Sequence, residues 1–328
     1  MIDLDASFVA KNIIKGDKRS LSKAITLCES SLPDHQKLAS QILDQCLPHT
    51  GKSIRIAITG VPGVGKSTFI DVFGNYLITQ HNKHVAVLAV DPTSQQTRGS
   101  ILGDKTRMNL LSMNESAFIR PSPSGDTLGG VAAQTRESIL LCEACGFDII
   151  LVETVGVGQS ETLVHDMVDF FLLLLLPGAG DELQGIKRGI VEMADMIAIN
   201  KSETNPRLAQ DAFSYYRNAL QLIHSTRSNW QTPVQKIDSV TLKNIDTIWN
   251  KISEFYADQK KNGWLDENRK KQATAWFEKQ IEVVFLRRLK SNENLQQQIE
   301  VLSEKVKNDQ LSPSSAAFQL VDTGMNLH

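Results

Sequence analysis

Hydrophobic positions along the 328-residue chain change their spacing several times, and each change predicts a different element. From residue 54 onward, short apolar runs alternate with segments whose apolar residues recur at helical spacing. The apolar runs predict strands at 54–59, 84–90, 117–120, 148–153, 170–176, 195–199 and 233–237. The segments between most of them predict helices at 66–80, 129–145, 181–193, 206–223 and 242–257. This alternation indicates an α/β fold with a mostly parallel, doubly wound sheet and a ligand site at the carboxyl ends of its strands.

Both ends of the chain lack the strand pattern and predict helices only. Residues 3–48 read as short amphipathic helices, and Pro48-His-Thr-Gly51 ends that pattern. After about residue 258 an apolar stripe repeats at helical spacing through Trp276, Phe277, Ile281, Val284, Phe285 and Leu289. The stripe must pack on the core or on a second subunit, and we favour the second subunit. The sequence therefore predicts an N-terminal helical extension at 1–50, an α/β domain at 51–258 and a C-terminal helical arm at 259–328.

Composition and charge exclude several classes of protein. The formal net charge is −2 and no basic block stands out, so we expect no nucleic-acid partner. The longest apolar run, 168–177, is too short to span a bilayer and predicts a buried strand. The N-terminus has neither an apolar signal core nor an Arg-rich transit sequence, and four cysteines suit a reducing compartment, so we expect a cytoplasmic protein. Cys142 and Cys145 form a C-x-x-C with no second pair nearby in sequence, which favours inert thiols over a metal or redox site.

A phosphate-binding motif, G-x-x-x-x-G-K-[ST], follows the first predicted strand and opens the next helix. Glycines let the backbone approach a polyphosphate closely, and the helix that follows adds the positive end of its dipole. In this motif the lysine reaches the β- and γ-phosphates and the hydroxyl binds Mg²⁺. The residues predicted to hold the triphosphate are Gly60, Val61, Pro62, Gly63, Val64, Gly65, Lys66, Ser67 and Thr68.

Two acidic residues end strands that should flank this loop, Asp91 and Glu153. Acids in such places hold Mg²⁺ directly or through water, so both are predicted metal neighbours together with Ser67. Gly156 follows Glu153 at the spacing of the D-x-x-G switch, whose glycine senses the γ-phosphate. Val157 stands where Ras-type proteins place a water-orienting glutamine, so we expect slow unaided hydrolysis.

The segment Asn200-Lys201-Ser202-Glu203 follows the strand predicted at 195–199, which is the position of the guanine-reading N-K-x-D motif. In that motif the aspartate accepts two hydrogen bonds from guanine. Glu203 has the same charge and one extra methylene, so guanine binding requires a shift of the backbone or side chain. Misplaced contacts of this kind cost on the order of 1–3 kcal/mol.

These motifs together resemble the MeaB/ArgK family of P-loop GTPases, the G-protein chaperones of methylmalonyl-CoA mutase that include the human methylmalonic aciduria type A protein. The resemblance covers about residues 15–255. The matching segments are 21–30, 60–68, 91–94, 99–108, 153–161 and 180–189. The chain departs from the family pattern at Glu203 and at Asp238-Ser239, where the family has Ser-Ala against guanine.

The resemblance implies a Mg²⁺-dependent homodimer with a C-terminal helical dimerisation arm. Its GTP/GDP cycle would gate adenosylcobalamin delivery to a B12-dependent acyl-CoA mutase and protect that enzyme. A cobalamin adenosyltransferase is a further candidate partner. The resemblance also implies that Asp104 joins the acidic metal neighbourhood. It places switches at 94–108, 154–166 and 178–187, and pairs Lys187 with Glu153 in the active arrangement.

Three other functions fit the motifs less well. A metal-insertion GTPase usually carries a His-rich or C-x-C-C segment, which this sequence lacks. An ATP-dependent transport-linked kinase would need a membrane partner and a phosphoacceptor site. A scaffold that binds nucleotide without turnover would not need Lys66, Ser67, Asp91 and Glu153 together.

Overall fold

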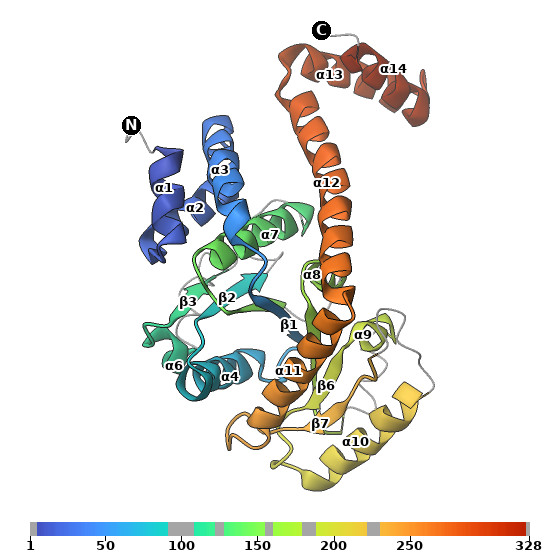
Figure 1. Cartoon of the computed structure of the whole chain (residues 1–328). Helices are drawn as coiled ribbons and strands as arrows, with labels where there is room; N and C mark the ends of the chain where they lie inside the picture. The colour runs from blue at the N-terminus through green and yellow to red at the C-terminus, as the bar shows by residue number, and fades with distance from the viewer. Residues whose placement is uncertain are drawn as a thin grey trace. The chain divides into compact units, whose positions relative to one another are not determined.

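The computed structural model describes residues 5–90, 108–121, 128–154, 160–178, 188–221 and 230–325. Its centre is a seven-stranded sheet in which every pairing is parallel, in the order β3-β2-β4-β1-β5-β6-β7 (Figure 1). The strands are β1 (Ile54–Gly60), β2 (Val85–Val90), β3 (Ala117–Arg120), β4 (Ile149–Thr154), β5 (Phe170–Leu175), β6 (Met196–Ile199) and β7 (Val234–Lys236). The α/β class and all seven predicted strands are thus confirmed.

Both faces of the sheet are buried, and side chains alternate between them with the period of two that a strand imposes. In β5, Phe171 and Leu173 join one hydrophobic cluster, while Phe170 and Leu172 join the other. Continuous apolar runs are typical of such doubly covered parallel strands. This explains why the sequence predicted them well.

Helices cover the two faces as a doubly wound fold requires (Figure 1). One cluster contains residues of α7 (Leu128–Ala144), α8 (Ser160–His165) and α10 (Pro206–Gln221). The other contains residues of α4 (Lys66–His81), α6 (Asn109–Ser112) and α11 (Ile245–Lys261). Of the helix predicted at 181–193, the structure describes α9 (Arg188–Met193).

The N-terminal helices pack on the α7 side of the sheet. They are α1 (Ala6–Ile14), α2 (Lys18–Glu29) and α3 (Pro33–Cys46), followed by the short 3-10 turn η1 (Leu47–His49). Asp17 caps α2 by accepting hydrogen bonds from the backbone N–H groups of Arg19 and Ser20. The guanidinium of Arg120 at the end of β3 pairs with the Glu29 carboxylate at the end of α2. The extension and the sheet therefore share one compact unit, residues 1–269.

A second compact unit spans residues 270–328. It contains most of α12 (Trp264–Ser291), then α13 (Glu293–Lys307) and α14 (Pro313–Met325). Asn292 caps α13, and α13 packs against α14. The predicted helical character of both chain ends is confirmed.

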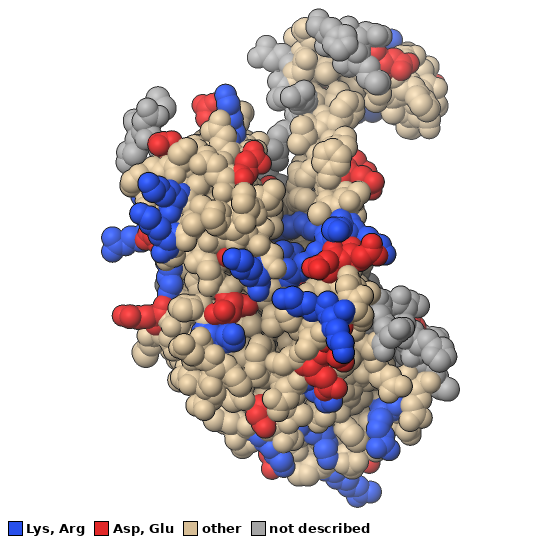
Figure 2. All heavy atoms as spheres, viewed as in Figure 1, with Lys and Arg blue, Asp and Glu red and all other residues tan. Residues whose placement is uncertain are grey.

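Charged side chains of both signs share the surface. On the face in view in Figure 2, Lys and Arg lie among Asp and Glu. Within the described parts of the chain, no helix is both long enough and apolar enough to cross a membrane.

Candidate nucleotide-binding site

The phosphate loop connects β1 to α4 at the carboxyl edge of the sheet. Gly60 lies so close to β5 that a Cβ built on it would stand 2.4 Å from the carbonyl oxygen of Leu174, so only glycine fits. Gly65 precedes α4 with φ of 93°, a left-handed conformation that glycine adopts without strain. The ammonium of Lys66 donates to the carbonyl oxygens of Gly60, at 2.8 Å, and Val61, at 3.4 Å. The loop thus folds back around its own lysine.

Asn200 and Lys201 tie the next part of the site to this loop. They follow β6, two strands away from β1 in the sheet. The Asn200 side-chain amide donates to the carbonyl oxygen of Val64 at 2.8 Å, and the Lys201 ammonium donates to that of Gly63 at 2.9 Å. Lys201 has φ of 58°, an uncommon left-handed backbone for a lysine. These two bonds fix the segment predicted to read the base against the loop predicted to hold the phosphates.

Glu153 is near the end of β4, which lies between β1 and β2 in the sheet. Its carboxylate accepts a hydrogen bond of 3.0 Å from the hydroxyl of Ser67. Burial lowers the pKa of the Lys66 ammonium, and the charges of Glu153 and of buried Glu161 on α8 oppose that shift. Lysine, hydroxyl and carboxylate therefore meet at one place, with the signs of charge that a Mg²⁺–triphosphate requires.

The oxygen donors of Ser67 and Glu153 fit a hard cation such as Mg²⁺. No group of three or more His, Cys, Asp or Glu residues comes together within the described ranges. The other two predicted metal residues, Asp91 and Asp104, lie outside the described residues. So do Gly156 and Lys187, together with residues 94–107, 155–159 and 179–187 of the three implied switch segments.

Asp238, just after β7, organises the loop of the base end. It is 4% exposed, and its carboxylate accepts backbone hydrogen bonds from Glu203, Val240 and Thr241 at 3.0–3.2 Å. Burial alone would raise its pKa. The hydrogen bonds outweigh burial and hold the pKa of this carboxyl below its ordinary value. Backbone N–H groups therefore stabilise the charge of Asp238 within the loop.

Ser239 is buried beside Asn200. Its backbone N–H and its hydroxyl both donate to the Asn200 side-chain oxygen, at 3.1 and 2.9 Å. Asn200 thus links the loop after β7 to the phosphate loop through the two ends of one amide.

Glu203 has a partner that the sequence analysis missed. Its carboxylate accepts a hydrogen bond of 2.6 Å from the ammonium of Lys243, and both side chains are substantially exposed. Forty residues separate the two along the chain. No motif marks Lys243, so the pairing becomes visible only when the loop after β7 is folded.

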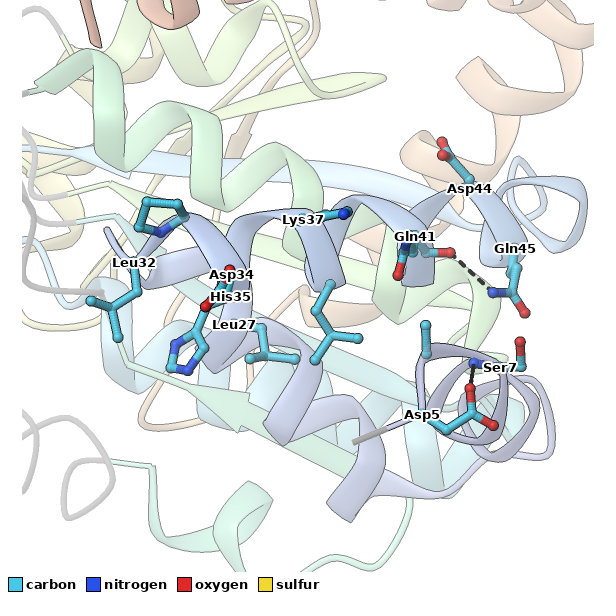
Figure 3. Close-up of a pocket in the computed structure, with 13 residues that line it drawn as sticks. Asp5, Ser7, Leu27, Leu32, Asp34, His35, Lys37, Gln41, Asp44 and Gln45 are labelled. Atoms are coloured by element: carbon cyan, nitrogen blue, oxygen red, sulfur yellow. Dashed lines mark hydrogen bonds between the residues drawn. The ribbon is translucent and has the colours of Figure 1, made fainter. Parts of the chain in front are cut away.

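Two other features lie away from this site. A groove in the N-terminal extension is lined by Asp34, Lys37 and Gln41 of α3, and by Asp5 and Ser7 at the start of α1 (Figure 3). It contains none of the predicted nucleotide-binding residues. Cys142 and Cys145 are buried free thiols, and burial raises the pKa of both, that of Cys145 to about 12, which favours the protonated thiol over the reactive thiolate.

Comparison with known proteins identifies the family of this chain. A family model described as methylmalonyl Co-A mutase-associated GTPase MeaB matches residues 21–294. The chain is 45% identical over 314 residues to a protein named GTPase ArgK from Escherichia coli, covering 94% of each chain. It is 42% identical over 327 residues to the mitochondrial methylmalonic aciduria type A homolog of Mus musculus, covering 96% of this chain and 79% of the relative.

A solved structure titled as a LAO/AO transport system kinase superposes with a TM-score of 0.75 at 36% identity. The superposition covers 99% of each chain. The relatives thus share the fold over its whole length while bearing different functional names.

Proposed function

The chain belongs to the MeaB family of GTPases, and we propose that it is a Mg²⁺-dependent GTPase chaperone of a B12-dependent acyl-CoA mutase. In this proposal GTP hydrolysis gates the delivery of adenosylcobalamin to the mutase and protects that enzyme. The GTPase activity itself follows from the family, whose relatives are named GTPases.

The observation that carries the nucleotide assignment is the pair of side-chain bonds from Asn200 and Lys201 to the phosphate loop. A ligand with a polyphosphate at one end and a base at the other would contact both segments at once. Because the segments are bonded to each other, binding at one end positions the other. A free phosphate or a metal ion alone would contact only one of the two segments, so its binding would not depend on the connection between them.

The Mg²⁺ assignment rests on Ser67 and Glu153. Their oxygens lie 3.0 Å apart at the start of α4, where a cation would neutralise phosphate charge. We propose that Asp91 and Asp104 complete the metal neighbourhood. Gly156 would sense the γ-phosphate, and Lys187 would pair with Glu153 when the client is bound.

The mutase assignment is supported by the description of the family and by the name of the mouse relative. It predicts slow basal hydrolysis that a client accelerates. Phosphate release from GTP should be measured with and without a B12-dependent mutase from the same organism. Acceleration of no more than twofold would contradict the chaperone role and leave a GTPase of another purpose.

A Lys187→Ala variant separates the proposed switch role of Lys187 from basal GTP hydrolysis. Basal hydrolysis should persist and the stimulation by the mutase should fall. If both fall equally, Lys187 is an ordinary catalytic residue. A Lys279→Ala variant is the matched control, because Lys279 is an exposed lysine of α12.

We further propose a homodimer formed through α12. Three apolar side chains of one helical stripe are exposed there, Phe277 at 64%, Ile281 at 53% and Phe285 at 42%. Isolated exposed apolar residues are common, but a stripe at helical spacing indicates a partner. Light scattering should find a dimer for the native chain and a monomer for Phe277→Asp/Ile281→Asp. A native monomer at micromolar concentration would contradict this assignment.

A transport-linked kinase is the second candidate, because the solved relative is named as one. The fate of the γ-phosphate distinguishes the two functions. A GTPase releases inorganic phosphate in proportion to the GDP formed. A kinase transfers the γ-phosphate to a protein acceptor, where a label carried by that phosphate would be found.

A further inference from the structure

We propose that Lys243 sets the base specificity of this site by occupying one oxygen of the Glu203 carboxylate. The pocket then reads the base chiefly through N1–H and gains little from the 2-amino group of guanine. The inference rests on the proposed function and on the position of Glu203 in the N-K-x-D motif, which predicts that its carboxylate faces the base.

Hydrogen bonds hold the backbones of both Glu203 and Lys243. Asp238 and Lys243 exchange two backbone hydrogen bonds, of 3.1 and 3.0 Å, which close the loop after β7. The Asp238 carboxylate also accepts the backbone N–H of Glu203. One residue thus holds the backbones of both the acid and the lysine at positions from which their side chains meet at 2.6 Å.

The backbone on each side of Lys243 is left-handed. Leu242 and Asn244 have φ of 62° and 58°, conformations that non-glycine residues adopt at a cost. The Asn244 side chain donates to the carbonyl oxygen of Lys236 at 2.8 Å and so keeps the chain in this path. Two uncommon backbone conformations therefore direct a lysine toward the acid that ends the N-K-x-E segment.

The purine bases differ in the groups that they would present to a Glu–Lys pair. Guanine presents two neighbouring donors, N1–H and the 2-amino group, which suit a carboxylate with both oxygens available. Hypoxanthine keeps N1–H and lacks the amino group. Xanthine keeps N1–H and carries a carbonyl oxygen at C2, which a bare carboxylate repels and an ammonium attracts. A Glu–Lys pair offers an acceptor beside a donor, so it tolerates hypoxanthine and xanthine better than a lone acid does.

Discrimination among nucleoside diphosphates tests this directly. Affinities of the native chain for GDP, IDP, XDP and ADP are compared with those of Lys243→Met, which keeps the length of the side chain and removes the charge. An exposed ion pair is worth up to roughly a fivefold effect. We therefore expect Lys243→Met to raise the GDP:IDP and GDP:XDP preferences by about three- to fivefold each, the XDP change being the larger.

Two further variants separate specificity from folding. Lys243→Arg keeps a donor at the same place and should retain native preferences. Lys251→Met removes a comparable exposed pair with Glu254 on α11 and should change no ratio. Unchanged ratios in Lys243→Met with GDP binding retained would overturn the inference alone. A native chain that binds GDP no better than ADP would overturn the guanine assignment of the proposed function, and the inference with it.

Discussion

All strands of the central sheet begin along one side of it, here called the amino edge, and end along the opposite side, the carboxyl edge. Both edges are rich in charged side chains, but these side chains have different partners. At the amino edge, Asp169 lies before β5 with no exposed side-chain surface, and its carboxylate accepts hydrogen bonds of 2.6–2.8 Å from the Arg269 guanidinium. Arg55 in β1 pairs with buried Glu143 of α7 through two bonds. At the carboxyl edge, Lys66 and Lys201 instead bond to carbonyl oxygens of the phosphate loop.

The difference lies in what each cation neutralises. Arg269 also donates to the carbonyl oxygens of Gly51 and Ser53, so it joins the start of α12 to the segment before β1. Its pKa is raised, because bonds and charge from Asp169 outweigh the burial that would lower it. Each arginine of this edge faces a carboxylate of the protein. The lysines of the other edge bond to carbonyl oxygens, and the Lys66 ammonium also lies near the charges of Glu153 and Glu161, in the place predicted for a ligand's phosphates.

Removing one partner at the amino edge should have the largest effect on stability. Asp169→Ala leaves the Arg269 guanidinium partly buried without its carboxylate, and breaking such a pair costs about 3–5 kcal/mol. Urea unfolding should report this loss. Glu254→Ala, which breaks an exposed pair on α11, is the control and should cost less than about 1 kcal/mol. Equal effects of the two variants would refute the contrast between the edges.

The phosphate lysine should show the opposite behaviour. Lys66→Ala removes the charge placed for the β- and γ-phosphates, so GTP hydrolysis should fall by about 10²- to 10³-fold. The free energy of unfolding should stay within about 1 kcal/mol of the native value, because the bonds from Lys66 to the loop carbonyls are ordinary hydrogen bonds. A loss of stability as large as that of Asp169→Ala would mean that this lysine is structural.

The sequence predicts the phosphate loop of the carboxyl edge better than the ion pairs of the amino edge. Local patterns in the sequence predict the strands and the phosphate loop. A continuous apolar run such as Phe170–Leu175 predicts a strand because both faces of the sheet are buried. Asp169 interrupts an apolar run, which already indicates a buried partner. The partner, Arg269, is 100 residues later in a helical segment with many charges, and no local pattern selects it.

The base end is harder to predict for a different reason. The motif position of Asn200–Glu203 is readable in the sequence, but the neighbours of Glu203 depend on a loop with left-handed residues at 242 and 244. The same conformation shifts the start of α11 to Ile245, three residues after the predicted start. Asp238 departs from the family pattern, and only the fold reveals that its carboxylate is bonded to backbone N–H groups.

Asn200 connects the two halves of the nucleotide site, so its loss should affect stability and binding together. Asn200→Ala leaves the Val64 carbonyl and the Ser239 donors without their partner, at a cost of about 1–3 kcal/mol. The free energy of GDP binding should weaken by at least the same amount, because the base loop is no longer held to the phosphate loop. An Asn200→Ala chain that loses stability while GDP affinity stays native would show that the two halves bind independently.

Asp238 should give the smallest effect and the one most specific in pH. Asp238→Asn keeps the shape of the side chain but removes the charge that receives three backbone N–H groups, at a cost of about 1 kcal/mol near neutral pH. The folded pKa of Asp238 lies below the ordinary 3.8, so its contribution is fully present above that value and is lost as pH falls through the folded pKa. The difference in unfolding free energy between native and Asp238→Asn chains should therefore stay constant from pH 7 to pH 5. It should shrink only below about pH 4. A difference that instead grows as pH falls from 7 to 5 would mean that burial raises the folded pKa of Asp238 above its unfolded value, and that the three backbone hydrogen bonds do not outweigh burial.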